Sequence, residues 1–150
     1  MAATRMRGFT LIEMIVVIVV IAILAGLVGP MVFSNVADAK VQGARTQIEL
    51  FGLALDAYRL DNDRYPTTEQ GLAALRTAPT TDPVPLRWRG PYLRKEVPPD
   101  PWGRPYSYQS PSTQNPAPES YALFSLGRDG QPGGTGEDAD LTSWGGPVHQ

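Results

Sequence analysis

The chain of 150 residues contains no cysteine and a single histidine, His149. Without disulfides, a small exported domain needs another source of stability, which is packing, assembly or a bound metal. With no thiol nucleophile, and with its one histidine next to the last residue, the chain offers no nucleophile–base arrangement, so we do not expect an enzyme. The 13 basic residues are scattered and are outnumbered by 15 acidic ones, which argues against a nucleic-acid partner.

Charged side chains are also missing from residues 14–33, which are almost all Ile, Val, Leu, Ala, Met or Gly. About 20 such residues are enough to cross a hydrocarbon core about 30 Å thick. Glu13 stands at the start of this run, where a carboxylate is costly unless it has a partner. A usual secretory signal is cut after its apolar run, whereas the plausible junction here, Gly8–Phe9, precedes it. Composition alone leaves open an uncleaved signal anchor with a basic cytoplasmic flank.

Beyond the apolar run the pattern becomes amphipathic, with apolar residues three and four positions apart. This spacing predicts one long helix from about Thr10 to about Leu60. Pro30 cannot donate a backbone hydrogen bond and its ring crowds the preceding turn, so we expect a kink or a locally melted stretch around Gly26–Phe33. Such a weak point is either a passive kink or a functional hinge. The predicted core face consists of Val41, Ala44, Ile48, Phe51, Leu55 and Tyr58.

The remaining residues predict short elements separated by turns. Thr67 or Thr68 would cap a short second helix. Alternating residues predict strands at Tyr106–Gln109 and Tyr121–Leu126, and a third short strand near the C-terminus is needed to complete a stable sheet. The expected fold class is α+β, with one long helix laid across a small antiparallel sheet. The apolar side of the short helix would be formed by Leu72, Ala73 and Leu75.

Residues 127–140, here called the acidic glycine loop, hold five glycines and four carboxylates. Glycines let the backbone turn sharply and bring carbonyl oxygens inward. Calcium takes six to eight oxygen ligands, and gathered carboxylates repel one another unless a cation neutralises them. The spacing is not that of an EF-hand. A calcium site and a solvated flexible loop both remain open at this point.

Residues 7–13, RGFTLIE, together with the apolar run resemble the class III signal of type IV pilins and pseudopilins. In that family a prepilin peptidase cuts after the glycine, and the new N-terminal phenylalanine is methylated. The resemblance implies cleavage between Gly8 and Phe9, N-methylation of Phe9, and a hallmark role for Glu13. Arg7 stands where lysine is common, which keeps the charge.

Three later segments are similar to the major pseudopilins of type II secretion: residues 61–72, 100–108 and 125–144. The resemblance thus extends over nearly the whole chain. It implies a pilin-like fold with a C-terminal calcium-binding loop. The calcium ligands that it implies are the Leu126 carbonyl and the side chains of Asp129, Asp138 and Asp140, with Glu137 as an alternate.

The resemblance also implies a division of the chain and a function. Residues 1–8 would be the cleaved leader, 9–33 a transmembrane and filament-core helix, and 34–150 a periplasmic domain. The chain would span the inner membrane of a Gram-negative bacterium once and would polymerise into a helical filament, the pseudopilus, that drives protein export through the outer membrane. Implied partners are further copies of the chain, minor pseudopilins, the prepilin peptidase, an inner-membrane assembly platform with its ATPase and, indirectly, the outer-membrane secretin.

Assembly would use three positions in particular: Phe9, Glu13 and Pro30. The amine of Phe9, which exists only after cleavage, would neutralise Glu13 of a neighbouring subunit. Two alternatives within the family are a type IV pilin and a minor pseudopilin, although major type IV pilins usually carry a C-terminal disulfide loop. An alternative from a different class is a signal-anchored calcium-binding domain that never polymerises.

Overall fold

The structure is a computed structural model that describes residues 9–114 and 120–148, with the backbone alone for 27–34. It forms two compact units, Met1–Val36 and Ala37–Gln150. The predicted leader, including Gly8, and the single histidine lie outside the described residues.

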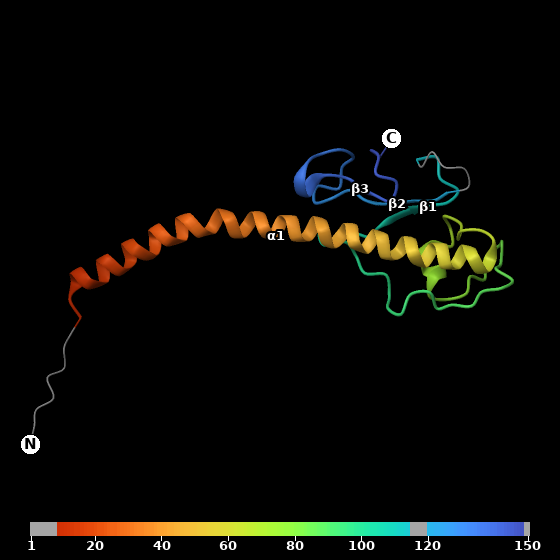
Figure 1. Ribbon diagram of the computed structural model, residues 1–150, viewed down its shortest axis with the longest axis horizontal. Coiled ribbons are helices and arrows are strands. Elements are labelled where there is room, and N and C mark those ends of the chain that lie inside the picture. The colour runs from red at the N-terminus through yellow and green to blue at the C-terminus, as the bar shows by residue number, and fades with distance from the viewer. Residues whose placement is uncertain (1–8, 115–119, 149–150) are drawn as a thin grey trace, which may run out of the picture. The chain divides into compact units, whose positions relative to one another are not determined.

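Helix α1, Leu11–Asn62, confirms the single long helix expected from the spacing of apolar residues (Figure 1). Its backbone is helical without interruption through residues 26–33. Of the two features expected there, the locally melted stretch is thus absent from this single chain, and the kink stays a prediction. The physical reason is that Pro30 removes one N–H donor, while the hydrogen bonds on both sides of it can continue.

Over residues 9–26, where its side chains are described, the first unit exposes its large apolar side chains to solvent. Leu11 is 78% exposed and Ile18 is 65% exposed, values typical of an interface without its partner. Among the described residues, no helical stretch is both long enough and apolar enough to cross a membrane.

The core of the second unit is built on one face of α1. Phe51, Leu55 and Tyr58 are fully buried there, as the sequence spacing predicted. Ala44 and Ile48 are also buried, and Val41 packs against the same cluster. Leu75, Leu123 and Leu141 complete the cluster from the rest of the unit.

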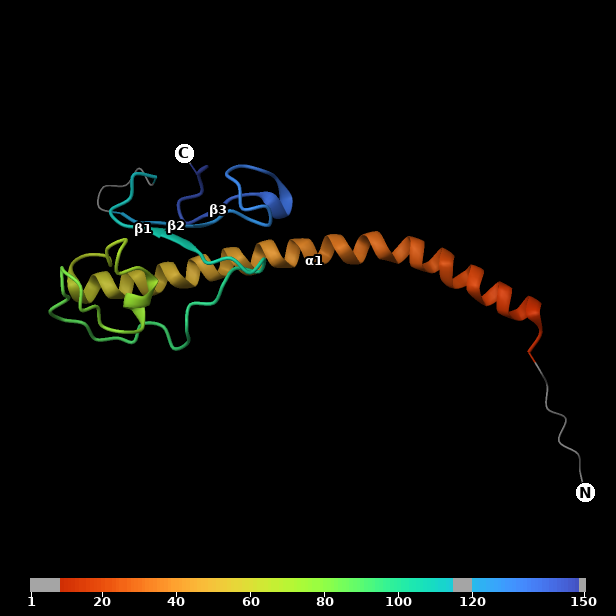
Figure 2. The ribbon, with the colours of Figure 1, turned by 180° about the vertical axis from the view of Figure 1, so that it is seen from behind.

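A three-stranded antiparallel sheet covers this core, with the order β1-β2-β3. Its strands are β1 (Ser107–Gln109), β2 (Ala122–Ser125) and β3 (Leu141–Thr142). Tyr108 pairs with Leu123 between the first two strands. Figures 1 and 2 show the sheet along one side of the C-terminal half of α1. The α+β architecture and the third short strand are therefore confirmed.

The short second helix is a 3-10 helix, η1, at Leu72–Leu75. The turn before it is held by reciprocal bonds, from the Gln70 backbone N–H to the Thr67 hydroxyl and from the Thr67 N–H to the Gln70 amide oxygen. The prediction that Ala73 lies on the buried side is wrong, because Ala74 is buried and Ala73 is exposed. A helix with three residues per turn aligns positions 72 and 75 and points position 73 elsewhere.

Candidate functional site

Glu13 is held at the start of α1 by a reciprocal arrangement with Thr10. The Glu13 carboxylate accepts from the Thr10 backbone N–H at 3.1 Å and from its hydroxyl at 3.2 Å, and the Thr10 hydroxyl accepts from the Glu13 N–H at 3.3 Å. This is a capping box, which satisfies donors that the first helical turn leaves unpaired. The Thr-x-x-Glu spacing was visible in the sequence, but reasoning about the isolated charge missed it.

Those predicted assembly residues whose side chains are described are exposed to solvent in the single chain. Phe9 is 79% exposed, and Glu13 is exposed one turn further along. Pro30 lies within the continuous backbone of α1. A carboxylate at a helix N-terminus is also favoured by the helix dipole. Glu13 thus has a local role in the single chain and remains free to meet a partner.

The acidic glycine loop folds back on itself through glycine backbone. Gly127 has a φ of +62°, and a Cβ added there would lie 2.5 Å from the Glu137 carbonyl oxygen. A Cβ on Gly134 would collide with the carbonyl of Asp138. Only glycine permits these approaches. The loop is closed by the Arg128 N–H, which donates to the Glu137 carbonyl at 2.8 Å.

The predicted calcium ligands lie on this loop or, for Leu126, directly before it, but each already has a local hydrogen-bond partner. The Leu126 carbonyl accepts from the Gly130 N–H at 3.2 Å. The Asp129 carboxylate accepts from the Gln131 N–H at 3.0 Å. Among the residues that the structure describes, no group of three or more acidic or histidine side chains is close enough to hold a metal.

One atom of the loop does fit a cation. Oδ2 of Asp140 accepts from the Gly133 N–H at 2.8 Å, but Oδ1 of the same carboxylate is buried and has no hydrogen-bond partner. A buried carboxylate oxygen without a donor is costly, and a metal ion would satisfy it. The predicted ligand atoms are all carbonyl or carboxylate oxygens, which are the ligands that calcium prefers.

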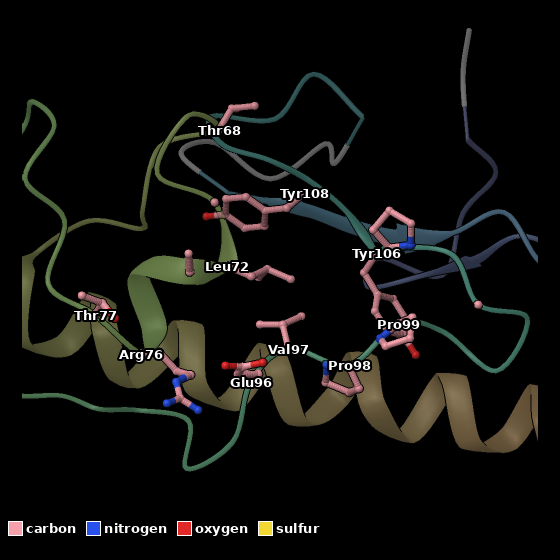
Figure 3. Close-up of a pocket in the computed structure, with 14 residues that line it drawn as sticks. Thr68, Leu72, Arg76, Thr77, Glu96, Val97, Pro98, Pro99, Tyr106 and Tyr108 are labelled. Carbon is pink, nitrogen blue, oxygen red and sulfur yellow. The ribbon is translucent and has the colours of Figure 1, made fainter.

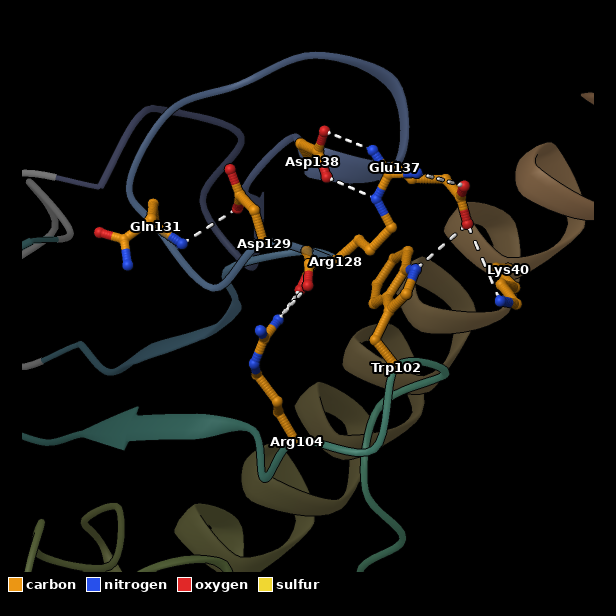
Figure 4. Close-up of polar contacts among 9 residues, drawn as sticks. Lys40, Trp102, Arg104, Arg128, Asp129, Gln131, Glu137 and Asp138 are labelled. Carbon is orange, nitrogen blue, oxygen red and sulfur yellow. Dashed lines mark hydrogen bonds and ion pairs between the residues drawn. The ribbon is translucent and has the colours of Figure 1, made fainter.

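The Asp138 and Glu137 carboxylates share a guanidinium (Figure 4). Arg128 donates to both oxygens of Asp138, at 2.9 and 2.8 Å, and lies 3.4 Å from Glu137. The hydrogen bond to Asp138 is the largest effect that raises the pKa of Arg128. Glu137 also accepts from the Trp102 indole at 3.2 Å and lies 3.9 Å from Lys40 of α1. The loop is thereby tied to the helix and to the preceding turn.

That preceding turn, residues 100–104, is organised by a buried carboxylate. Asp100 is 4% exposed and accepts from the Ser125 hydroxyl at 2.6 Å and from the Arg104 N–H at 2.8 Å. Arg104 in turn donates through Nη1 to the carbonyls of Gly127 and Arg128. The sequence predicted the tight turn but not its burial, because Ser125 comes from a strand 25 residues away.

A groove of about 740 Å³ lies between η1 and the segment 96–108 (Figure 3). Leu72, Val97, Tyr106 and the prolines 98, 99 and 105 give it apolar walls, with Arg76 and Glu96 among its polar groups. Burial raises the pKa of the Tyr108 phenol, which donates to the Pro66 carbonyl at 2.8 Å. The described lining contains no serine, cysteine or histidine.

Comparison with known families gives two matches. A family model described as "Type II secretion system (T2SS), protein G" matches residues 31–144. A second, described as "Prokaryotic N-terminal methylation motif", matches residues 4–29. The second match covers the Gly8–Phe9 junction and Glu13.

Several curated proteins are similar over nearly their full length. The type II secretion system core protein G of Pseudomonas aeruginosa is 46% identical over 144 residues, which is 96% of this chain and 99% of that protein. The protein of the same description from Vibrio cholerae is 46% identical over 141 residues, covering 93% of this chain and 92% of that protein.

A solved structure supports the fold. It is the crystal structure of the major pseudopilin from the type 2 secretion system of enterohaemorrhagic Escherichia coli, with a TM-score of 0.61 and 40% identity. The match covers 75% of this chain and 92% of that one. The long helix and small antiparallel sheet are thus the pilin-like fold that the sequence resemblance implied. By its sequence and by its structure, this chain belongs to the protein G family of the type II secretion system.

Proposed function

We propose that this chain is the structural subunit that polymerises into the periplasmic pseudopilus of type II secretion and so drives protein export. The observation that carries the proposal is the exposed apolar first unit on a chain of the protein G family. Leaving apolar surface in water costs about 25 cal/mol per Å², so this unit requires either lipid or the apolar helices of neighbouring subunits around it. The family consists of structural subunits, which agrees with a role without catalysis.

Glu13 supplies the register of this assembly. Cleavage between Gly8 and Phe9 creates a new amine, which would lie against Glu13 of a neighbouring subunit in the filament. At an effective dielectric constant near 20, two charges 4 Å apart attract by about 4 kcal/mol before desolvation is subtracted. The capping box with Thr10 keeps the carboxylate satisfied until that partner arrives.

The contact between Phe9 and Glu13 joins two different surfaces, and heterologous contacts that do not close generate open helices. Such growth requires a prepilin peptidase to expose the amine and an inner-membrane platform with an ATPase to add subunits. Minor pseudopilins would join the same filament, and the outer-membrane secretin would receive the exported protein. In this proposal residues 9–33 anchor the subunit in the inner membrane of a Gram-negative bacterium before assembly, and residues 34–150 lie in the periplasm.

Calcium is the second part of the proposal. The Leu126 carbonyl and the carboxylates of Asp129, Asp138 and Asp140 would hold the ion, with Glu137 as an alternate ligand. The unpaired buried oxygen of Asp140 supports this assignment. A bound hard cation would neutralise the loop and fix its backbone in a domain that has no disulfide.

The assembly proposal is tested in cells that produce the full chain with its secretion system. Glu13→Ala is expected to leave the protein in the membrane fraction but to abolish filaments seen by electron microscopy. Glu49→Ala, which removes an exposed carboxylate from the other half of α1, is the matched control. Filaments of normal length and number from Glu13→Ala would contradict the proposed pairing.

The mass of the mature protein separates this function from a plain signal anchor. Processing predicts a chain that begins at N-methyl-Phe9, whereas a non-polymerising anchored domain would keep residues 1–8. A mature protein that still carries those residues would overturn the proposal.

The calcium proposal is tested by thermal unfolding of the full chain in detergent, with calcium or with a chelator. Calcium is expected to raise the Tm of the unsubstituted chain, and Asp140→Asn is expected to reduce that shift. Asp38→Asn, at an exposed position on α1, should leave it unchanged. An unsubstituted chain with the same Tm under both conditions would count against the metal site.

A further inference from the structure

Arg128 donates hydrogen bonds to both carboxylate oxygens of Asp138, which is one of the proposed calcium ligands. Its Nε donates to Oδ1 of Asp138 at 2.9 Å and its Nη2 donates to Oδ2 at 2.8 Å. Nη1 reaches Glu137 at 3.4 Å, so the same guanidinium lies between the two acidic side chains (Figure 4). A planar guanidinium that bonds both oxygens of a carboxylate is among the strongest and most specific ion pairs.

The position of this guanidinium is fixed by backbone contacts as well as by its charge. The Arg128 N–H donates to the Glu137 carbonyl at 2.8 Å. Its own carbonyl, and that of Gly127, accept from Nη1 of Arg104. Gly127 permits the close approach, since a Cβ there would meet the Glu137 carbonyl oxygen at 2.5 Å. The fold therefore places residue 128 opposite residues 137 and 138.

A divalent cation entering this loop would meet two obstacles at Arg128. The guanidinium is a like charge next to the proposed ligands, and it already holds Asp138 through both of its oxygens. Like charges in one site disfavour each other, as opposite charges favour each other.

We propose that Arg128 is a built-in counter-cation that competes with calcium for Asp138 and so lowers the affinity of this loop for the metal. Without calcium, the guanidinium neutralises the carboxylates of residues 137 and 138 and keeps the loop closed. With calcium, Arg128 releases Asp138 and turns to solvent, where its side chain is already 57% exposed. The inference rests on the proposed calcium site and adds that the loop has a second, metal-free folded form.

The test is a calcium titration of the full chain in detergent micelles, measured by isothermal calorimetry. Arg128→Gln removes the charge and the two-point contact, and we expect it to bind calcium at least about tenfold more tightly. Its Tm in chelator is expected to fall below that of the unsubstituted chain, because the carboxylates lose their counter-charge. Arg128→Lys keeps the charge without the planar fork and should fall between the two in both measurements.

Arg87→Gln is the matched control. It removes the same charge from an exposed arginine that pairs with Asp63 at 3.8 Å, away from the loop. Its calcium affinity should equal that of the unsubstituted chain, which excludes a general effect of net charge.

The outcomes separate this inference from the calcium proposal itself. If the unsubstituted chain binds calcium and Arg128→Gln binds it equally or more weakly, the competition is disproved and the metal site survives. If neither the unsubstituted chain nor any variant binds calcium, both proposals fall together. If Arg87→Gln gains as much affinity as Arg128→Gln, the effect is one of overall charge and the assignment to Arg128 is wrong.

Discussion

The turn at residues 100–104 and the acidic glycine loop at 127–140 both carry carboxylates, but they are stabilised in different ways. Asp100 is buried and accepts from two backbone N–H groups and the Ser125 hydroxyl. The carboxylates of the loop are partly or fully exposed, and two of them pair with the exposed side chain of Arg128. A carboxylate that accepts from buried donors of the chain needs no ligand, whereas the two carboxylates on the exposed loop are neutralised by a counter-cation, the guanidinium of Arg128.

The largest expected effect is a loss of stability when the buried carboxylate of the turn at residues 100–104 is removed. Asp100→Ala removes three accepted hydrogen bonds and leaves one donor, the Ser125 hydroxyl, buried and two backbone N–H donors partly buried, so it should lower the free energy of unfolding by about 3–5 kcal/mol. Asp38→Ala, at an exposed site on α1, should change it by less than about 0.5 kcal/mol. Urea unfolding measures both. Equal costs for the two variants would show that the buried turn contributes no special stability.

The next effect concerns the backbone of the loop. Gly134→Ala and Gly136→Ala both place a side chain at positive φ, +82° and +62°, which costs roughly 1–2 kcal/mol in either case. Only at Gly134 would the new Cβ also collide with the Asp138 carbonyl, whereas Gly136 has open space around it. Gly134→Ala should therefore cost about 2 kcal/mol more in unfolding free energy. An equal cost would mean that the loop is open at residue 134.

A smaller effect is the pH dependence of stability that comes from the buried phenol of Tyr106, which lies near Asp100. Burial raises the pKa of Tyr106 to about 12, and the charge of Asp100 adds to the rise. The unfolded chain loses this proton near pH 10 and the folded chain only near pH 12, so stability is complete below pH 10 and falls as pH rises towards 12. Tyr106→Phe should reduce that fall by about 1–2 kcal/mol. An identical fall in the variant would show that Tyr106 titrates normally.

The smallest effect is a difference in how the Tm of variants in the acidic glycine loop and in the turn at residues 100–104 depends on salt. In chelator, Arg128→Gln should lower the Tm slightly, and the difference should vanish near 1 M salt, where charges are screened beyond about 3 Å. The deficit of Asp100→Ala should persist at the same salt concentration, because the Asp100 side chain is buried. Differential scanning calorimetry measures both. A salt-resistant deficit for Arg128→Gln would show that this ion pair behaves like a buried one.

The long helix and its buried face could be predicted because apolar spacing encodes them directly. Phe51, Leu55 and Tyr58 recur at the helical period, and all three are buried. The strands were found for the same reason, with boundaries one or two residues too long. The short helix was predicted with the wrong buried residue, Ala73, because its period is three and not 3.6.

The details of the site were less accessible from sequence because they depend on contacts between distant residues. The partner of Arg128 is Asp138, ten positions away, and not the adjacent Asp129. The burial of Asp100 depends on a hydroxyl from β2. The capping box of Glu13 is the exception, since its partner Thr10 is three residues away and the Thr-x-x-Glu spacing is visible in the sequence. The calcium ligands stay a prediction.

We propose that this chain assembles through Glu13 and the amine created by processing. The most direct measurement is the distance between the Phe9 nitrogen of one subunit and the Glu13 carboxylate of its neighbour in a filament structure determined by electron cryomicroscopy. The proposed function predicts a separation within ion-pair distance, about 4 Å or less. A filament in which every Phe9 amine lies beyond about 8 Å from any neighbouring Glu13 carboxylate, roughly the screening length at physiological salt, would contradict it.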